Sequence, residues 1–291
     1  MKKVLSYLII FIIIYPISLF AKDKIEWLIL DIPPSFIVEG KFKGEGLDGK
    51  VMYSLQKQLS EYDHTTLIVN ETRAFQMFWQ GKNACYQGPI WSPERDKIAH
   101  FSLNSVIVPT FSILMKNSTY NKYYKGLKSI SLKNLLNENK LILGYVKDRS
   151  YGEVVMPIIS QYCNKRNCFI YEGESFSTGL IKMIAANRIG YIIEYPWVAE
   201  YYRSIISQDD VKLRILQIDE LKDNQYVWAG TACTKNNWGK EIINKINDIL
   251  KKEIPTQRWR GIVEPWLDEN AVPEYRKAYN KIILKQIQKG Q

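Results

Sequence analysis

The sequence predicts an α/β protein of two lobes, each built on a mainly parallel sheet that is flanked by helices. Strand-like and helix-like segments alternate in two blocks along the chain, a pattern typical of parallel sheets covered on both faces. Two extended apolar runs, residues 106–111 and 226–232, separate the blocks and predict hinge strands. We therefore expect lobe 1 to comprise residues 22–108 and 229–291, with lobe 2 inserted as residues 109–228.

The first 21 residues have the pattern of a secretory signal peptide. Lys2 and Lys3 precede an apolar run without charges, and cleavage is expected after Ala21. The apolar run has about the length needed to span a bilayer, so an uncleaved N-terminal anchor is the alternative. Either form predicts export from the cytoplasm.

The composition fits an exported globular protein. Of the 291 residues, 46% are hydrophobic and 24% are charged, which is enough to bury a sizeable core. The formal net charge is +10, and it becomes +8 without Lys2 and Lys3. The positive net charge predicts a mild preference for anionic partners. Because basic and acidic residues are mixed along the chain, we expect no nucleic-acid partner.

The first block predicts three strands, at residues 25–30, 65–69 and 84–88, and two helices, at residues 50–62 and 73–80. Thr72 is the expected cap of the second helix. The first strand must end before Pro33 and Pro34, because proline cannot donate to a strand ladder.

The second block continues the alternation. Residues 105–115 are expected to cross between the lobes, and the polar residues 117–126 are expected to form a loop. Helices and strands then follow in turn, at residues 132–136, 141–146, 150–162, 168–171, 178–187, 191–194, 196–206 and 213–218. A helix at about residues 238–252 and the tail from Pro255 are expected to pack on lobe 1.

Polar side chains gather at three turns where a predicted strand leads into a helix. Ligands of open α/β sheets bind at such turns, outside the carboxyl ends of the strands. At the first turn, Ser92 and Pro93 predict a helix start, with Arg95 in its first turn. A helix dipole disfavours a cation there unless an anion meets it. A solvated surface arginine is the alternative.

The second and third turns supply the other candidates. Ser150 and Glu153 form an S-x-x-E capping box, and Arg149 before it could clamp a carboxylate or phosphate or face solvent. Glu194 ends an apolar strand before Pro196, where a carboxylate needs a partner. It could meet a ligand, cap a helix or form an internal salt bridge. Arg73, after the second strand, could also face the cleft.

The stretch A-C-Y-Q-G-P-I-W-S-P-E-R-D-K-I-A-H-F-S at residues 84–102 resembles the family 3 extracellular solute-binding proteins, which are type II periplasmic binding proteins and include amino-acid receptors. The pattern D-x-P-P-x-F from Asp31 and the run G-T-A-C-T-K-N-N-W-G from Gly230 extend the resemblance over nearly the whole mature chain. The resemblance implies a monomeric periplasmic protein that closes two lobes on a small-molecule ligand. The implied partners are the membrane subunits of an ABC importer or a sensor protein.

The resemblance also implies roles for single residues. Arg95 would bind the ligand carboxylate, and Glu194 would bind its amino group, a pair suited to a zwitterion such as an amino acid. Phe36 would line the pocket, and Gly88 and Trp91 lie in the matching turn. This chain departs from the family pattern where Ile90 and Trp91 replace Ser or Thr. The predicted ligand-binding set is Arg95, Glu194, Phe36, Trp91, Gly88, Arg149, Ser150 and Arg73.

The four cysteines suit an oxidising compartment. Cys163 and Cys168 enclose four residues and are expected to form a local disulfide. Cys85 and Cys233 either pair or are buried thiols. No metal site is expected, because a zinc site would need more nearby ligands.

A binding protein without enzymatic activity or cofactor is the predicted function. The chain has no G-x-S-x-G, H-E-x-x-H or glycine-rich phosphate loop. The alternative is a periplasmic enzyme on the same scaffold, a dehydratase of a cyclic carboxylate, with Glu194 as its acid-base candidate. His64 and His100 are expected to be structural.

Overall fold

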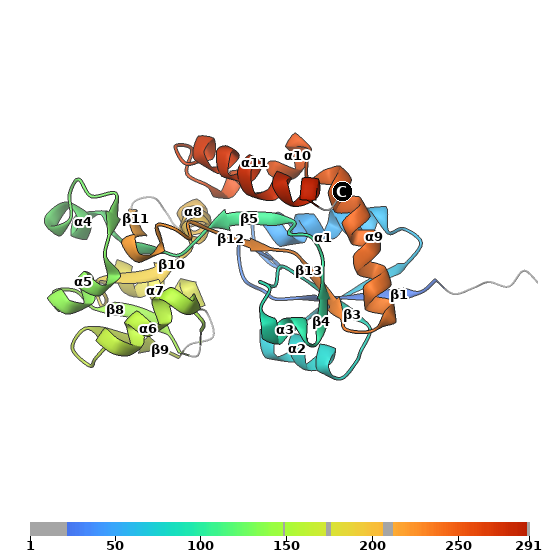
Figure 1. The fold of residues 1–291 in the computed structure, drawn as a ribbon. Coiled ribbons are helices and arrows are strands. Elements are labelled where there is room, and N and C mark those ends of the chain that lie inside the picture. The colour runs from blue at the N-terminus through green and yellow to red at the C-terminus, as the bar shows by residue number, and fades with distance from the viewer. Residues whose placement is uncertain (1–21, 148, 173–175, 206–211, 290–291) are drawn as a thin grey trace, which may run out of the picture.

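A computed structural model describes residues 22–147, 149–172, 176–205 and 212–289 (Figure 1). Its strands form a five-stranded sheet of order β2-β1-β3-β13-β4, a six-stranded sheet of order β7-β11-β6-β10-β8-β9, and a two-stranded ribbon, β12-β5. The ribbon runs between the two larger sheets in Figure 1. We call the five-stranded sheet with its helices lobe 1, and the six-stranded sheet with its helices lobe 2.

Lobe 1 is a mixed sheet with helices on both faces. β1 is parallel to β2 and β3, whereas β13 is antiparallel to β3 and β4. Helices α1 and α9 pack on one face, and α2 packs on the other. The elements are β1 (Lys24–Ile29), α1 (Leu47–Gln58), β2 (Asp63–Ile68), α2 (Glu71–Trp79), β3 (Ala84–Gln87), α3 (Pro93–Asp96), β4 (Ala99–Phe101), β13 (Thr231–Thr234) and α9 (Asn237–Glu253).

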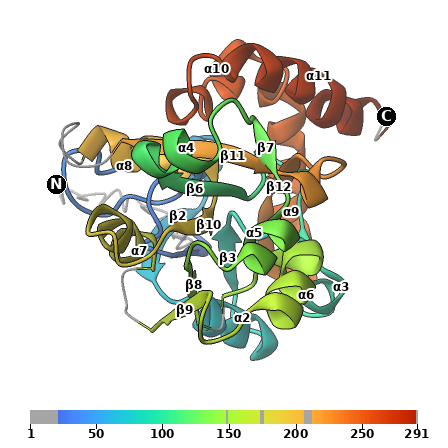
Figure 2. The same cartoon turned by 90° about the vertical axis from the view of Figure 1, so that its left-hand side faces the viewer.

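Lobe 2 repeats this arrangement. β8, β9 and β10 are parallel, and β6 runs antiparallel between β10 and β11. Helices α5 and α6 cover one face of the sheet and α7 and α8 the other, as Figure 2 shows for α5, α6 and α7. The elements are β6 (Ser112–Lys116), α4 (Asn117–Tyr123), β7 (Ser129–Ile130), α5 (Leu132–Glu138), β8 (Leu143–Val146), α6 (Gly152–Tyr162), β9 (Cys168–Tyr171), α7 (Phe176–Ala185), β10 (Tyr191–Glu194), α8 (Pro196–Ile205), β11 (Leu213–Ile218) and η1 (Asp219–Leu221).

The ribbon joins the lobes with two antiparallel strands, β5 (Val106–Pro109) and β12 (Tyr226–Ala229). Residues 105–115, expected as one crossover, are divided after Pro109: β5 belongs to the ribbon, while β6 is a central strand of lobe 2. Proline fits this position because it is the last residue of a strand with only one neighbour.

The C-terminal tail packs on lobe 1 and on the ribbon. It contains α10 (Gln257–Arg260), η2 (Glu264–Trp266) and α11 (Val272–Lys289), and Figure 1 shows α10 and α11 beside β5. Buried Trp259 donates from Nε1 to the carbonyl of Ser105, 2.7 Å away, directly before β5. The tail therefore fixes the lobe 1 end of the ribbon.

Local sequence signals placed several boundaries wrongly. α1 begins at Leu47 because its first amides donate to carbonyls of the preceding loop, and α2 is capped by Asn70 rather than by Thr72. Residues 117–123 are helical, not a loop, because Tyr120 is buried and its hydroxyl bonds to the backbone of residues 126 and 127. β4 was not predicted at all.

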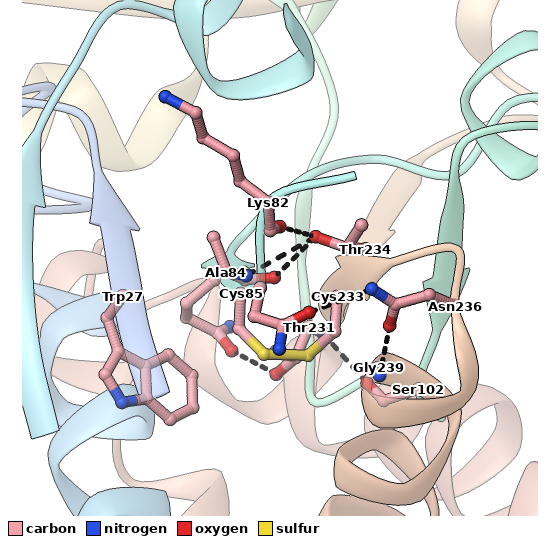
Figure 3. Close-up of a disulfide and its surroundings, with 12 residues drawn as sticks. Trp27, Lys82, Ala84, Cys85, Ser102, Thr231, Cys233, Thr234, Asn236 and Gly239 are labelled. Carbon is pink, nitrogen blue, oxygen red and sulfur yellow. Dashed lines mark hydrogen bonds between the residues drawn. A yellow bond between two sulfur atoms is a disulfide. The ribbon is translucent and has the colours of Figure 1, made fainter. Parts of the chain in front are cut away.

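Two disulfides hold the fold. The predicted Cys163–Cys168 bond joins the end of α6 to β9. The second joins Cys85 on β3 to Cys233 on β13, directly opposite each other in the ladder, with Cα atoms 4.1 Å apart (Figure 3). Of the two alternatives for these buried cysteines, the structure therefore has the disulfide and not free thiols.

The part of the chain that the structure describes contains no helix long and apolar enough to cross a membrane. The same residues contain no group of three or more potential metal ligands. The predicted signal peptide and its cleavage after Ala21 lie outside the described residues.

Candidate functional site

The carboxyl ends of the parallel strands in both sheets lie at the ribbon. In lobe 1, Gln87 ends β3 opposite Thr231, and the Gly88 amide donates to Gly230 at 2.9 Å, where the ribbon begins. In lobe 2, Glu194 ends β10 opposite Ser112, three residues beyond the ribbon. The ribbon between these ends has four residue pairs, which corresponds to roughly 13 Å of strand, and Gly230 and residues 110–111 add to the separation. The predicted turns thus lie at two edges that share one hinge.

Glu194 and Arg149 form a buried ion pair at the lobe 2 edge. Arg149 donates from Nη1 and Nη2 to the two carboxylate oxygens, at 2.6 and 2.7 Å. The Ser177 hydroxyl at 2.6 Å and the Tyr195 amide at 2.9 Å also donate to this carboxylate. The Glu194 side chain is 1% exposed and that of Arg149 is 21% exposed. Arg149 and Glu194 were both predicted to bind the ligand. In the structure they bind each other.

Aromatic rings surround the Arg149 guanidinium. Its Cζ lies 5.2 Å from the ring centre of Tyr151, 5.5 Å from that of Phe111 and 6.0 Å from that of Tyr195. Phe111 and Tyr195 stack with ring centres 4.1 Å apart, and Trp197 also stacks on Tyr195, with ring centres 5.2 Å apart. These rings fix the guanidinium by cation–π attraction and by packing.

The ion pair controls the protonation of its members. Burial by itself would raise the pKa of Glu194, but the charge and hydrogen bonds of Arg149, with those of Ser177 and the Tyr195 amide, lower it below the ordinary value. Burial opposes the charge on Arg149, yet Glu194 outweighs it and raises the Arg149 pKa. Both groups are therefore charged at neutral pH.

Arg95 is the main cation at the lobe 1 edge. As predicted, Ser92 caps α3, and Pro93 begins it. The Arg95 guanidinium donates to Glu71 at 2.6 Å and to the Ile90 carbonyl at 2.9 Å, and it lies 4.5 Å from the Phe75 ring centre. Its side chain is 28% exposed, whereas that of Glu71 is 52% exposed. The cation thus has an exposed partner that a ligand could replace.

The two edges interact electrostatically. Burial is the main cause of the raised pKa of Tyr195 in lobe 2, and Glu71 of lobe 1 adds to it. The charge of Arg149 lowers this pKa, and Glu194 raises it more than Glu71 does.

The other predicted site residues have ordinary surroundings. Trp91 is 51% exposed and donates from Nε1 to Asp96 at 3.2 Å. Arg73 is exposed and donates to Gln76 at 3.1 Å. Phe36 is buried in the lobe 1 core beside Gly49. For these three, ligand contact stays a prediction.

The expected capping box at Ser150 is not formed. α6 begins at Gly152, and its cap residue is Tyr151, which makes no side-chain cap bond. Gly152 has φ +78°, and the buried Tyr151 hydroxyl instead accepts the Val146 amide at 3.0 Å. The Ser150 hydroxyl accepts the Gly152 amide at 3.3 Å, so it still bonds the first residue of the helix. Ser150 is exposed, and Asp148 lies outside the described residues.

Position 88 requires glycine for two reasons, its left-handed backbone conformation and the lack of room for a Cβ atom. Its φ is +98°, and a Cβ there would lie 2.7 Å from Oδ2 of buried Asp48. Asp48 accepts hydrogen bonds from Ser35 and from Gln87, and Gln87 accepts one from Thr231 at 2.6 Å. This buried network ties three segments of lobe 1 to the start of the ribbon.

We predict that Gly88→Ala lowers the free energy of unfolding by about 2–4 kcal/mol, because it combines a left-handed backbone with overpacking against Asp48. The matched control is Gly44→Ala, where φ is +78° but a Cβ meets nothing within 4 Å. That variant should lose only about 1–2 kcal/mol. Urea unfolding measures both, and equal losses would contradict the clash with Asp48.

Sequence reasoning missed Glu71, Phe75, Phe111 and Ser177. Glu71 begins α2 and Ser177 lies in the first turn of α7, so position at a strand-to-helix turn was the available signal. Their partners are 24 and 17 residues away, and Phe111 contacts Arg149 from the residue directly before β6. Only the order of strands in the sheets brings these groups together.

The fold is that of the type II periplasmic binding proteins. Solved structures that share it include an ancestral cationic amino acid solute-binding protein, at 17% identity and TM-score 0.62 over 85% of this chain and 96% of that chain. A probable amino-acid ABC transporter extracellular-binding protein from Bacillus subtilis has 14% identity and TM-score 0.64, over 86% and 99%. A histidine kinase sensor domain with similarity to periplasmic binding proteins has 13% identity and TM-score 0.60, over 85% and 96%.

These likenesses establish the fold alone, because the identities are low. No protein-family model matches the chain, and no curated protein matches it.

Proposed function

We propose that this chain is a periplasmic solute-binding protein of the family 3 type. It captures a small, polar, carboxylate-bearing ligand between its lobes for an ABC importer or a sensor protein, and it works as a monomer without a cofactor. The observation that carries this proposal is the placement of Arg95 and Arg149, one from each lobe, at edges joined by a two-stranded hinge. Solved proteins of the same fold are described as amino-acid binding or sensor proteins, which supports it.

Binding follows from hinge closure. Rotation about β5 and β12 brings the two edges together around the ligand and excludes water, so hydrogen bonds to the ligand strengthen in the closed site. The ligand carboxylate replaces Glu71 at Arg95, because Glu71 is exposed and bonds Arg95 through one oxygen. The Phe75 ring below keeps the guanidinium in place during this exchange.

The alternative dehydratase function has less support. Its acid-base candidate, Glu194, has a lowered pKa despite burial, because Arg149 holds it as a carboxylate. Such a group is a poor proton donor at neutral pH. The amide and hydroxyl donors on both oxygens also leave it little room to act as a base.

The test is a thermal-shift screen of the mature protein with amino acids and short carboxylic acids, together with native mass spectrometry for a co-purified molecule. A bound ligand raises Tm with concentration and is recovered unchanged. Small-angle scattering should show a smaller radius of gyration with the ligand, as closure requires. The absence of any ligand and of any closure would contradict the proposed function.

We predict that Arg95→Ala weakens a carboxylate ligand by roughly 100-fold, since two charge-assisted hydrogen bonds contribute about 1.5 kcal/mol each. The matched control is Arg258→Ala in the tail helix α10, whose side chain is exposed and pairs with Glu253. This control should bind as the natural protein does. Isothermal titration measures both affinities, and unchanged binding by Arg95→Ala would contradict its assigned role.

A further inference from the structure

We propose that Arg149, and not Glu194, is the group with which lobe 2 holds the ligand, and that Glu194 is the residue that positions Arg149. Together with Arg95 in lobe 1, this makes the preferred ligand a small organic dianion, with one anionic group toward each lobe, as in a dicarboxylate. The inference rests on the proposed function and makes the ligand class more specific.

Glu194 has no acceptor capacity left for a ligand ammonium group. A carboxylate offers about four lone-pair positions. All four are used, by two N–H groups of Arg149, the Ser177 hydroxyl and the Tyr195 amide, at 2.6–2.9 Å. The side chain is also almost completely covered. An ammonium group could reach it only by displacing one of these donors.

Arg149 still has free donor capacity. A guanidinium carries five N–H groups. Two donate to Glu194, and Tyr151 lies close enough to engage one more, so two N–H groups have no partner among the described residues. One fifth of the side chain is exposed, in contrast to Glu194. The part of this ion pair that a ligand can meet is therefore the cation.

The surroundings of Arg149 favour an anion and disfavour a cation. Glu194 and the rings of Phe111, Tyr151 and Tyr195 hold the guanidinium in one orientation, which lowers the entropic cost of binding. An amine bound beside Glu194 would lie within a few Å of this fixed positive charge, in a poorly solvated site. Like charges at such a distance repel strongly.

Each of the two arginines is paired with a glutamate, so neither Arg95 nor Arg149 brings net charge to its lobe in this structure. The pairs differ in how easily they open: Glu71 is half exposed and makes one contact, whereas Glu194 is buried and bound fourfold. A dianion would displace Glu71 at one end and bind the outer face of an intact pair at the other.

The experiment uses matched ligands in isothermal titrations: glutarate, L-glutamate and 4-aminobutyrate, and likewise succinate, L-aspartate and β-alanine. In each set the first ligand is a plain dicarboxylate. The second carries an additional ammonium group, and the third has an ammonium group in place of one carboxylate. We expect the plain dicarboxylate to bind tightest, at least 10-fold better than its amino-acid counterpart. The ligand with a terminal amine should bind weakest.

Two variants test the role of Glu194. Glu194→Gln should weaken glutarate or succinate, whichever binds better, by at least 10-fold, about as much as Arg149→Gln does. A residue that accepts the ligand amine would instead leave the dicarboxylate unaffected when changed to Gln. Glu194→Asp should restore part of the affinity by keeping the charge beside Arg149.

Ser177→Ala is the second variant, for use if Glu194→Gln does not fold. It frees one lone pair of Glu194 and leaves Arg149 paired. We expect the dicarboxylate to keep its preference over the amino acid. A gain for the amino acid that reverses the preference would overturn the inference.

The outcomes separate this inference from the proposed function. If an amino acid or amine binds tightest, or if no dicarboxylate binds, the inference is wrong. The proposed function still stands in those cases if the wider screen finds another ligand that closes the lobes. It fails only if no ligand and no closure are found.

Discussion

Replacing Cys85 and Cys233 together with alanine is expected to lower the free energy of unfolding by about 5 kcal/mol. Their disulfide closes a loop with a sequence separation of 148 residues, and a loop of this length restricts the unfolded chain strongly. The bond also joins two adjacent strands in the middle of the lobe 1 sheet. Urea unfolding of the oxidised protein and the variant gives the difference.

The matched control is the removal of Cys163 and Cys168, which are only five positions apart. The same entropic relation gives about 2 kcal/mol for that bond. If the two double variants lose equal stability, loop entropy is not the main contribution of the Cys85–Cys233 bond.

Replacing Arg149 with methionine is expected to lower the free energy of unfolding by about 3–5 kcal/mol at pH 7. The change leaves the Glu194 carboxylate buried without its countercharge, which is far more costly than removing both members of the pair. The double variant Arg149→Met with Glu194→Leu should therefore recover most of the loss. A double variant as unstable as the single one would mean that packing, and not charge, is decisive here.

The pH dependence of the same variant has an expected sign. In the natural protein the folded pKa of Glu194 lies below its ordinary value of 4.5, so its contribution to stability is complete above pH 4.5 and is lost as the pH falls through the folded pKa. Without Arg149, burial raises the folded pKa, so this group then favours folding at low pH. The loss caused by Arg149→Met should thus be smaller at pH 4 than at pH 7.

The sequence predicted the fold well because its signals are local. Strands such as β1, β6 and β10 are short apolar runs, and Ser92 caps α3 through a bond to a residue only three positions away. The start of α6 was predicted to within two residues, since the helix begins at Gly152. The capping box itself is not formed, because the Ser150 hydroxyl accepts the Gly152 amide at 3.3 Å in place of the amide of Glu153. A local pattern can therefore locate a helix start without giving its hydrogen bonds.

The candidate site was only partly predictable. Arg95, Arg149 and Glu194 were found because each lies where a strand ends and a helix begins. Their partners could not be found, because Arg149 and Glu194 are 45 residues apart and meet only through the neighbouring ends of β8 and β10. The sequence likewise favoured a ligand amine for Glu194, since its internal partner depends on the order of strands in the sheet.

The position of β13 in lobe 1 affects the order in which the two sheets can form. β13 lies between β3 and β4, so the five-stranded sheet lacks an internal strand until residues 231–234 have been synthesised. The strands of the other sheet all come from residues 112–218 and are available earlier. During synthesis from the N-terminus, the chain therefore has every strand of the lobe 2 sheet before the lobe 1 sheet can be completed.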